Sequence, residues 1–470
     1  ASGRADLVRN DRATLESLGG LTIDTARLLN RNLHFATELA QVGGATRHLY
    51  IQPEDDPDKH NANEYRWESW SRAGRYRNKQ TGEAVHAWTQ YDVTQTVYET
   101  RVIESVPALI RSGGNMTLRG SELVNDKSRI IAGGTLHGDL DRLNNVAASG
   151  EHVTRQSGTS QYTYSKWRGG FKRYHQRKWD GKIAYTPADL VETIALNVSK
   201  VVQNAAGGDL NVDGRQMARQ PITEVPADPQ PFHRPATGDN ASADRADAPT
   251  RIRTIEVETD VPANSLFRAA PQAGDYLVET DPRFADYRNW LSADYMLSQL
   301  GYEPASVHKR LGDGFYEQTL VRDQIGQLTG RRFLDGYASD EAQYRALLDA
   351  GSTYAKAWNL RPGVALSAAQ MAQLTSDIVW LVERDVTLAD GTPTRALVPQ
   401  VYVRVKPGDL DARGTLLAAH AIDLDLKGDW VNSGTLAGRT ALKLTAENLR
   451  NLGGRLSGDA VALSARTDID

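Results

Sequence analysis

The amino-acid sequence predicts a mainly β protein: a right-handed parallel β-helix interrupted by β insertions and by a small α-rich domain. Three observations support this class: a repeat of about 20 residues near the C-terminus, aromatic clusters outside that repeat, and a later stretch rich in helix-capping residues. A fixed period near 20 with short alternating strands is typical of a solenoid, because one unit is too short to bury its own apolar face.

The repeat is clearest over residues 408–470, which we assign to β-helix coils. Three leucines recur at a spacing of 20 residues: Leu416, Leu436 and Leu456. Apolar residues alternate with polar ones in each unit, at Ile422 and Leu424, at Leu442 and Leu444, and at Val461 and Leu463. Asn432 and Asn451 each close a unit. Such units are expected to stack as parallel strands, rising about 4.8 Å per coil.

Weaker copies of the unit predict further coils over residues 1–47, 111–157 and 188–215. GGLTIDTARLLNRN, from Gly19, and GGTLHGDLDRLNN, from Gly133, both combine an alternating start with an apolar–Asn ending. In the third stretch Ile194, Leu196 and Val198 alternate. The alternative is a set of β-hairpins with an accidental period, and three C-terminal copies in register argue against it.

An aromatic-rich β insertion is predicted over residues 48–110. Tyrosines and tryptophans crowd between Tyr50 and Tyr98, and in VHAWTQYDV alternate residues fall on one face. This period of two indicates a small antiparallel sheet. Because function often sits on insertions carried by a scaffold, four aromatic residues are candidates for partner binding: Trp67, Trp70, Trp88 and Tyr91.

A second, basic-aromatic insertion is predicted over residues 158–187. Arg and Lys alternate with Trp, Tyr and Phe in SKWRGGFKRYHQRKWDGK, which contains a single acid, Asp180. The run fits a hairpin with aromatics packed inward, a site for an anionic surface ligand, or a nucleic-acid site that uses charge and stacking. Charge patterning favours the nucleic-acid site least, and no nucleic-acid partner is expected. The candidates for partner binding here are Trp167, Arg168, Arg173, Tyr174, Arg177 and Trp179.

The remaining stretch divides into a Pro-rich linker over 216–254 and an α-rich domain over 255–407. The linker has few large apolar side chains, so little surface could be buried in it. Helix caps predict four helices, running from Asp281 to Gly301, from Asp313 to Gly330, from Ser339 to Gly351 and from Ser367 through Leu381. Ser367 and Gln370 form a capping box, followed by apolar residues at helical spacing: Met371, Leu374, Ile378 and Leu381.

The C-terminal units resemble the haemagglutinin repeats of two-partner-secreted exoproteins, the family of filamentous haemagglutinin and of CdiA, the contact-dependent growth inhibition protein. The likeness extends to strings outside the repeats: YLVETDPRFADYRNWLSADYMLSQLG from Tyr276, HKRLGDGFYEQ from His308, LTSDIVWLVE from Leu374 and LVPQVYVRV from Leu397. It covers residues 265–470 well and residues 48–187 least. The resemblance implies an internal segment of a long, secreted, rod-shaped protein attached to the outer membrane of a Gram-negative bacterium.

Composition is compatible with this resemblance. The net charge is −4 and charged residues make up 24%, which gives no overall bias toward polyanions. Cysteine is absent, as suits a protein exported through an oxidising compartment. No apolar run reaches the 18 residues that a membrane span requires, so no span is expected. Ala1 opens into polar sequence without a signal peptide, so in a secreted parent that signal would lie elsewhere.

The sequence predicts no catalytic site, no metal site and no cofactor. The acidic string from Glu54 to Asp58 lacks the glycine and terminal glutamate of an EF-hand. His48, His60 and His86 have no zinc-ligand spacing, and no nucleophile or HExxH motif occurs.

The leading functional hypothesis is a non-catalytic, receptor-binding surface segment that contacts a neighbouring bacterium during toxin delivery. The resemblance implies an outer-membrane receptor protein, or lipopolysaccharide or another glycan of the target cell, as its partner, and an outer-membrane transporter during secretion. The alternatives are a segment of a host-cell adhesin and a structural or export relay without its own ligand. A polysaccharide-processing enzyme would need paired acids on neighbouring coils, and the sequence shows no clear pair.

Overall fold

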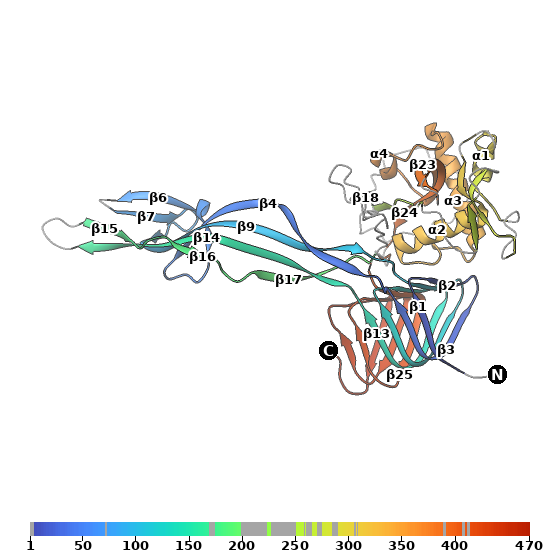
Figure 1. Cartoon of the computed structure of the whole chain (residues 1–470), viewed down its shortest axis with the longest axis horizontal. Coiled ribbons are helices and arrows are strands. Elements are labelled where there is room, and N and C mark those ends of the chain that lie inside the picture. Colours follow the sequence, from blue (N-terminus) through green and yellow to red (C-terminus); the bar gives the residue numbers. More distant parts are fainter. Residues whose placement is uncertain are drawn as a thin grey trace. The chain divides into compact units, whose positions relative to one another are not determined.

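The computed structural model describes residues 4–70, 73–168, 174–198, 223–226, 251–257, 259, 266–269, 275–283, 290–304, 307, 309–388, 392–406, 409–410 and 414–470. The chain forms two compact units, which Figure 1 draws with their strands labelled. The scaffold unit comprises Ala1–Phe35, Glu104–Ala148 and Asn197–Asp470. The inserted unit comprises Ala36–Ile103 and Ser149–Leu196.

The scaffold unit contains an all-parallel sheet, built in the described residues from thirteen strands. The N-terminal strands are β1 (Ala5–Asp11), β2 (Thr14–Ser17), β3 (Leu21–Arg31), β10 (Leu109–Ser112), β11 (Met116–Asp126), β12 (Arg129–Ala132) and β13 (Thr135–Val146). The C-terminal strands are β25 (Leu416–Leu426), β26 (Trp430–Asn432), β27 (Thr435–Ala446), β28 (Leu449–Asn451), β29 (Arg455–Ser457) and β30 (Ala460–Ala465). The curled stack in Figure 1 agrees with the predicted parallel, repeat-based architecture.

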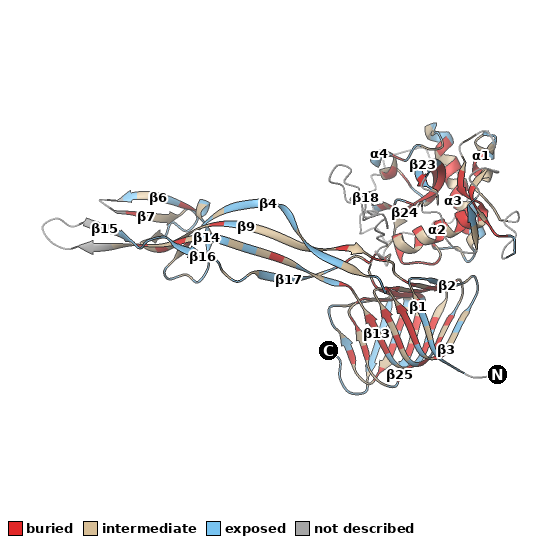
Figure 2. Ribbon diagram, viewed as in Figure 1, coloured by how far each residue is buried: buried red, intermediate tan, exposed pale blue. Residues whose placement is uncertain are grey.

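Strand pairing follows the repeat and continues across the insertions. Met116 pairs with Leu136, and Leu136 pairs directly with Ile422 although the whole α/β part of the chain lies between them. Stacked apolar side chains fill the inside of the sheet in columns, shown as buried in Figure 2. One column runs through Leu123, Leu143, Trp430 and Leu449. Each unit therefore buries its apolar face on its neighbours.

The C-terminal register confirms part of the predicted repeat and corrects the rest. Ile422 and Leu424 pair with Leu442 and Leu444, which pair in turn with Val461 and Leu463, as predicted. Leu436 pairs with Leu456 as predicted, but the equivalence of Leu416 with them is wrong, because Leu417 is the residue that pairs with Leu436. A register shift between Ala419 and Ala421 absorbs the extra residue, and a one-residue bulge of this kind leaves no mark in the apolar pattern.

A ladder of asparagines, all buried except the half-buried Asn451, runs through the stack. Each side-chain amide donates to the Oδ1 of the next asparagine at 2.7–2.8 Å, in the order Asn10, Asn30, Asn125, Asn145, Asn432 and Asn451. The same amides also donate to main-chain carbonyls at the corners, for example from Asn30 to Arg129 and from Asn125 to Leu416. The ladder thus satisfies the buried polar groups where each unit turns.

The rest of the scaffold unit is an α/β block. Its seven-stranded sheet comprises β18 (Thr223–Pro226), β19 (Arg251–Thr254), β20 (Phe267–Ala269), β21 (Tyr276–Thr280), β22 (Arg310–Gly312), β23 (Ile378–Thr387) and β24 (Pro393–Val405). Its described helices are α1 (Asp294–Gln299), α2 (Gly314–Thr329), α3 (Asp340–Trp358) and α4 (Ala368–Ala372). Strands β18 and β19 lie inside the stretch predicted to be a linker, whose other residues lie outside the described ranges.

Two of the predicted helices keep their predicted starts. The Asp313 side chain accepts a hydrogen bond from the Tyr316 amide to cap α2, and Gly330 ends that helix with φ 67°. Ser339 caps α3 as predicted, but this helix runs past Gly351 to Trp358. Gly351 is a packing position: a Cβ there would lie 2.0 Å from the Val379 carbonyl oxygen.

The first and fourth predicted helices differ from expectation. In the first predicted range the described helix is α1, residues 290–293 are not helical, and residues 284–289 lie outside the described ranges. The Asp281 side chain forms ion pairs with Arg268 and Arg283 and accepts from the Arg283 amide at 3.0 Å. The capping box of Ser367 and Gln370 is present, yet α4 ends at Ala372, and the chain continues into β23 from Ile378. A short, fully apolar run fits a buried strand as well as a helix, which explains the error.

The inserted unit is antiparallel throughout its described strand pairs. Its larger sheet contains β4 (Ala36–Pro53), β5 (His60–Asn61), β9 (Ala87–Glu104), β14 (Ser149–Arg168), β15 (Tyr174–Trp179), β16 (Ile183–Tyr185) and β17 (Leu190–Ala195). Its smaller sheet contains β6 (Tyr65–Trp70), β7 (Ala73–Asn78) and β8 (Ala84–Val85), preceded by the short 3₁₀ helix Ala62–Glu64. The two predicted insertions therefore join, because β14 pairs with β9 over thirteen residues.

Some predicted coils belong to this inserted unit. Residues 36–47 lie in β4 and residues 149–157 lie in β14. Within 188–215, Leu190–Ala195 forms β17, antiparallel to β14, and residues 199–215 lie outside the described ranges. The alternation that suggested a coil is real, but an edge strand of an antiparallel sheet has the same period of two. In the part of the chain that the structure describes, no helix has the length and apolar character needed to cross a bilayer.

Candidate functional site

Aromatic side chains gather at one end of the inserted unit, where β6, β7 and β9 meet. The Trp88 ring contacts Tyr76 and Trp67 edge-on, with centroids 5.2 Å and 5.9 Å away. Trp88 is 2% exposed and, with Ile51 and Tyr65, forms a small core. Trp88 therefore supports the surface from below and does not form it, contrary to its selection as a contact residue.

Trp67 forms the surface of this cluster. Its ring lies over Gly74, where a Cβ would come within 1.7 Å of the ring, so a glycine is required opposite it. The Trp67 residue is 44% exposed although its ring contacts Tyr76 and Trp88. Exposed aromatic side chains on a rigid support are typical anchors of protein interfaces. Trp70 ends β6 opposite Ala73, and its side chain lies outside the described ones.

Tyr91 belongs to a second aromatic contact on the same unit. Its ring lies 4.7 Å from that of Tyr185, and the Lys59 ammonium sits 4.5 Å from the Tyr91 centroid and 4.4 Å from the Tyr185 centroid. The Tyr91 hydroxyl donates to Gln52 at 2.7 Å. Burial raises the pKa of Tyr91, and Lys59 opposes that rise. The Tyr91 ring is thus already engaged by a cation from its own chain.

The predicted basic-aromatic residues lie along the β14–β15 hairpin. In its register Trp167 pairs with His175, Arg168 with Tyr174, Ser165 with Arg177, and Thr163 with Trp179. Trp179 is 58% exposed. The side chains of Trp167, Arg168, Tyr174 and Arg177 lie outside the described ones, and Arg173 lies outside the described residues altogether. The structure therefore brings the backbones of five candidates together on one hairpin, and Trp179 is the one whose side chain is described.

Further exposed apolar side chains, which the sequence reasoning missed, lie on the inserted unit. In the inserted unit the large exposed hydrophobic residues are Leu39, Val42, Leu49, Trp67, Trp179, Ile183, Leu190 and Val191. They lie on β4, β6, β15, β16 and β17, and Figure 2 shows the exposed stretches of β4 and β17. Scattered apolar residues are normal on a surface, but this unit combines many of them with a small core. In the sequence, these residues are marked only by their apolar type, which does not show whether a neighbouring element covers them.

Three arginines beside Trp67 share a single carboxylate, that of Glu68. Glu68 forms ion pairs with Arg77 at 2.8 Å, with Arg75 at 3.0 Å and with Arg66 at 3.1 Å. Hydrogen bonds from Arg77, and then from Arg75, lower the pKa of Glu68 to about 2 despite some burial of the carboxylate. The smaller sheet therefore combines aromatic contact area with a set of arginines that stays net positive.

A row of acids on the parallel sheet bears on the enzyme alternative. Asp139 pairs with Asp425 on the neighbouring unit, a juxtaposition that the sequence did not reveal. Arg466 lies 3.4 Å from Asp425, and Lys443 lies 3.5 Å from the adjacent Asp423. A glycosidase needs a pair of carboxyl groups that flank the scissile bond, whereas Asp423 and Asp425 are exposed and form ion pairs with these cations. No cluster of three or more metal-binding side chains occurs among the described residues.

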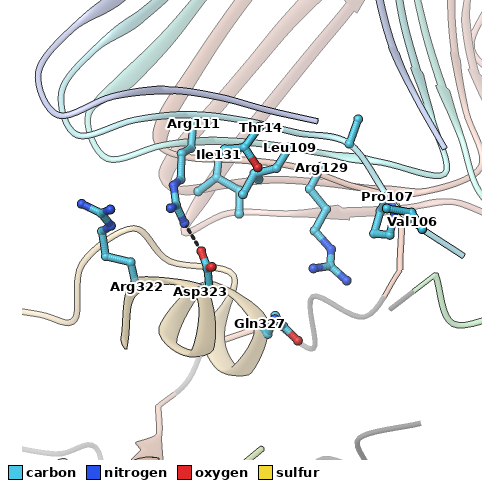
Figure 3. A pocket seen from close by; sticks show the side chains of 12 residues that line it. Thr14, Val106, Pro107, Leu109, Arg111, Arg129, Ile131, Arg322, Asp323 and Gln327 are labelled. Carbon is cyan, nitrogen blue, oxygen red and sulfur yellow. Dashed lines mark hydrogen bonds and ion pairs between the residues drawn. The ribbon is translucent and has the colours of Figure 1, made fainter. Parts of the chain in front are cut away.

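A pocket lies elsewhere, in the scaffold unit, between the parallel sheet and α2 (Figure 3). Its apolar floor includes Pro107, Leu109 and Ile131, and its polar lining includes Arg111, Arg129, Arg322, Asp323 and Gln327. The Glu16 carboxylate ties the sheet to the α/β block behind this pocket, at 2.7 Å from Arg111 and 3.4 Å from Arg322. Burial raises the pKa of Glu16, but the nearby arginines outweigh burial and hold it below its usual range.

Comparison with known proteins identifies the repeat. The model of the haemagglutinin repeat family matches residues 1–40, 100–159 and 399–470, the ranges that contain most of the parallel sheet. A protein of Yersinia pestis named Toxin CdiA is 31% identical over 449 residues, covering 84% of this chain. The tRNA nuclease CdiA-2 of Burkholderia pseudomallei strain 1026b is 39% identical over 213 residues, covering 45% of this chain.

These relatives are far longer than the matched region. The chain spans 13% of the length of the Yersinia pestis protein and 7% of the length of the Burkholderia pseudomallei protein. The Escherichia coli protein named Toxin CdiA is 30% identical over 217 residues, which cover 42% of this chain and 7% of that protein. No solved structure matches the chain. By its haemagglutinin repeats and its similarity to these proteins, the chain belongs to the filamentous haemagglutinin and CdiA family of exoproteins.

Proposed function

We propose that this chain is a non-catalytic surface segment of a contact-dependent growth inhibition exoprotein, and that its inserted unit binds a receptor on a neighbouring bacterium. In this proposal the parallel sheet belongs to a right-handed β-helix, which serves as a rod at the surface of the secreting cell. The α/β block and the inserted unit are elaborations carried by that rod.

The observation that carries the proposal is the placement of exposed apolar and aromatic side chains on the inserted unit. Trp67 and Trp179 remain exposed on strands that are held by antiparallel neighbours. Little conformational entropy is therefore lost when a partner covers them. The small core beneath them, centred on Trp88, fixes the position of Trp67. The partner would be an outer-membrane protein or a lipopolysaccharide or other surface glycan, against which aromatic rings can pack.

The test measures binding of the labelled full chain to whole Gram-negative cells. We expect saturable binding, and we expect the double variant Trp67→Ala, Trp179→Ala to bind at least tenfold more weakly, because buried tryptophans contribute about 2 kcal/mol or more at interfaces. Tyr302→Ala is the matched control, since it removes an aromatic residue that is 37% exposed in the scaffold unit. Near-ultraviolet circular dichroism checks that each variant keeps its aromatic packing.

The outcomes separate the competing functions. Equal binding by the double variant and by the parent chain would contradict the placement of the site. Binding to host cells but not to bacteria would favour a host-cell adhesin. Failure of the folded chain to bind any cell, combined with loss of export after removal of residues 255–407 from the parent exoprotein, would favour an export relay. Protease treatment of the target cells distinguishes a receptor protein from a glycan.

A further inference from the structure

The pocket between the parallel sheet and α2 is lined by several cationic side chains. Its lining includes three arginines, Arg111, Arg129 and Arg322, against one acid, Asp323. Asp323 is already bound by Arg111, the contact drawn as a dashed line in Figure 3. This lining lies wholly within the scaffold unit and is separate from the aromatic surface of the inserted unit.

Arg111 is held in place and still has donors to offer. Its Nε and Nη2 donate to the two oxygens of Glu16 at 2.7 Å and 3.0 Å, and its Nη1 donates to Asp323. A guanidinium carries five N–H groups, so two of them remain beyond these three bonds. A buried arginine fixed by two carboxylates presents its remaining N–H groups in a defined direction, which suits recognition of an oxyanion.

Arg322 is a second buried arginine at the pocket, and it is fixed by carboxylates as Arg111 is. Its side chain is almost fully buried, and its partners include Asp340 at 3.0 Å and Glu16, which it shares with Arg111. Burial, and then the like charge of Arg111, lower the pKa of Arg322 despite these two carboxylates. Carboxylates therefore hold both Arg111 and Arg322 in place at the pocket.

The open side of the pocket is formed by Arg129 and Gln327. Figure 3 shows the Arg129 side chain reaching from the sheet toward α2, on the side where Gln327 lies. The cavity measures about 130 Å³, compared with the ~30 Å³ that one water occupies in the liquid. This space suits a group of the size of a phosphate or sulfate. The apolar lining at Pro107, Leu109 and Ile131 could contact the organic part of a phosphate or sulfate ester.

We propose that this pocket binds a tetrahedral oxyanion, a phosphate or sulfate group, through Arg111, Arg129 and Gln327. The bound anion would bridge the parallel sheet and the α/β block, because Arg111 and Arg129 come from strands β10 and β12, and Gln327 comes from α2. The group is either a free ion or an ester carried by a glycan or a lipid headgroup, and both sources share the chemistry that the arginines recognise.

The test is calorimetric titration of the full chain with inorganic phosphate, sulfate, glucose 1-phosphate and glycerol 3-phosphate, each against sodium chloride of equal ionic strength. We expect saturable binding of at least one of these oxyanions and none of chloride. Arg129→Leu should weaken that binding at least tenfold, and Gln327→Ala should weaken it severalfold. Arg142→Leu, which removes an exposed arginine from the same sheet, should leave the binding unchanged.

The pattern of results decides both the proposal and the source of the anion. Tighter binding of glucose 1-phosphate points to a phosphorylated glycan, tighter binding of glycerol 3-phosphate points to a lipid headgroup, and preference for inorganic phosphate or sulfate points to the free ion. Equal affinity of the parent chain, the Arg129→Leu variant and the Gln327→Ala variant would overturn the proposal. So would the absence of saturable binding of all four probes by the folded chain.

Discussion

Asn125→Ala is expected to destabilise the parallel sheet by about 3–5 kcal/mol, because it breaks the asparagine ladder at its centre. The Asn125 side chain is fully buried, accepts from Asn30 at 2.8 Å and donates to Asn145 at 2.7 Å. Its amide also donates to the Leu416 carbonyl at 3.1 Å. Alanine would leave the Oδ1 of Asn145 and this carbonyl without their donor in a dry interior, at roughly 1–3 kcal/mol for each buried group.

Pulse-labelling hydrogen exchange across a urea gradient, read by mass spectrometry, measures this effect segment by segment. The method suits a chain of two units, for which a single unfolding transition is not expected. Asn144→Ala is the matched control: it removes the same side chain from the residue next to Asn145, the ladder partner of Asn125, and Asn144 points to the opposite face of β13. We expect that control to cost less than ~0.5 kcal/mol. Similar losses in the two variants would show that the ladder contributes little.

The asparagine ladder also shows how far the sequence could lead. Asn432 and Asn451 stand out in the sequence because their units are consecutive, and their hydrogen bond confirms that they are equivalent. The bond from Asn145 to Asn432 joins residues separated by the whole α/β block. Nothing local marks that pairing, because it follows from the chain returning to the sheet in register. The repeat was therefore predictable within a run of units and hidden across an insertion.

The inserted unit was harder to predict for the same reason. Its two segments read as separate insertions, and the pairing of β9 with β14 that joins them depends on long-range register. Trp88 and Trp179 look alike in the sequence, since both lie in alternating strands rich in aromatics. The first is buried because the smaller sheet packs over it, and the second is exposed. Sequence pattern gave the residue types of the candidate site but not which of them face solvent.

Glu317→Gln is expected to abolish a pH dependence of stability that is built into the α/β block. The Glu317 carboxyl is completely buried on α2, where one oxygen accepts from the Ala293 amide at 2.6 Å and from the Tyr344 hydroxyl at 3.0 Å. No donor among the described residues reaches its other oxygen. Burial, with a further contribution from the negative charge of Asp294, raises the pKa of Glu317 to about 8.

The direction of this pH dependence follows from proton binding. The unfolded chain releases the Glu317 proton near the ordinary pKa of 4.5, whereas the folded chain keeps it up to about pH 8. The stabilising contribution is therefore complete below pH 4.5, declines as pH rises through this window, and is lost above pH 8. One pKa unit corresponds to ~1.4 kcal/mol, so the whole decline is of the order of 5 kcal/mol. Nearby Arg310 opposes the shift and limits its size.

Urea unfolding of α2 at pH 5.5, 7.0 and 8.5, followed by the same exchange method, measures the slope. Glutamine keeps a carbonyl oxygen for Ala293 and Tyr344 but cannot ionise, so the stability of Glu317→Gln should exceed that of the parent chain least at pH 5.5 and most at pH 8.5. Glu341→Gln is the matched control, because Glu341 is an exposed residue of α3 paired with Arg345. Asp377, whose pKa burial also raises, contributes equally to all three proteins. Parallel pH curves for the parent chain and Glu317→Gln would contradict the prediction, because they would mean that Glu317 is already ionised in the folded chain. Arg310 would then be the nearby cation that compensates its charge.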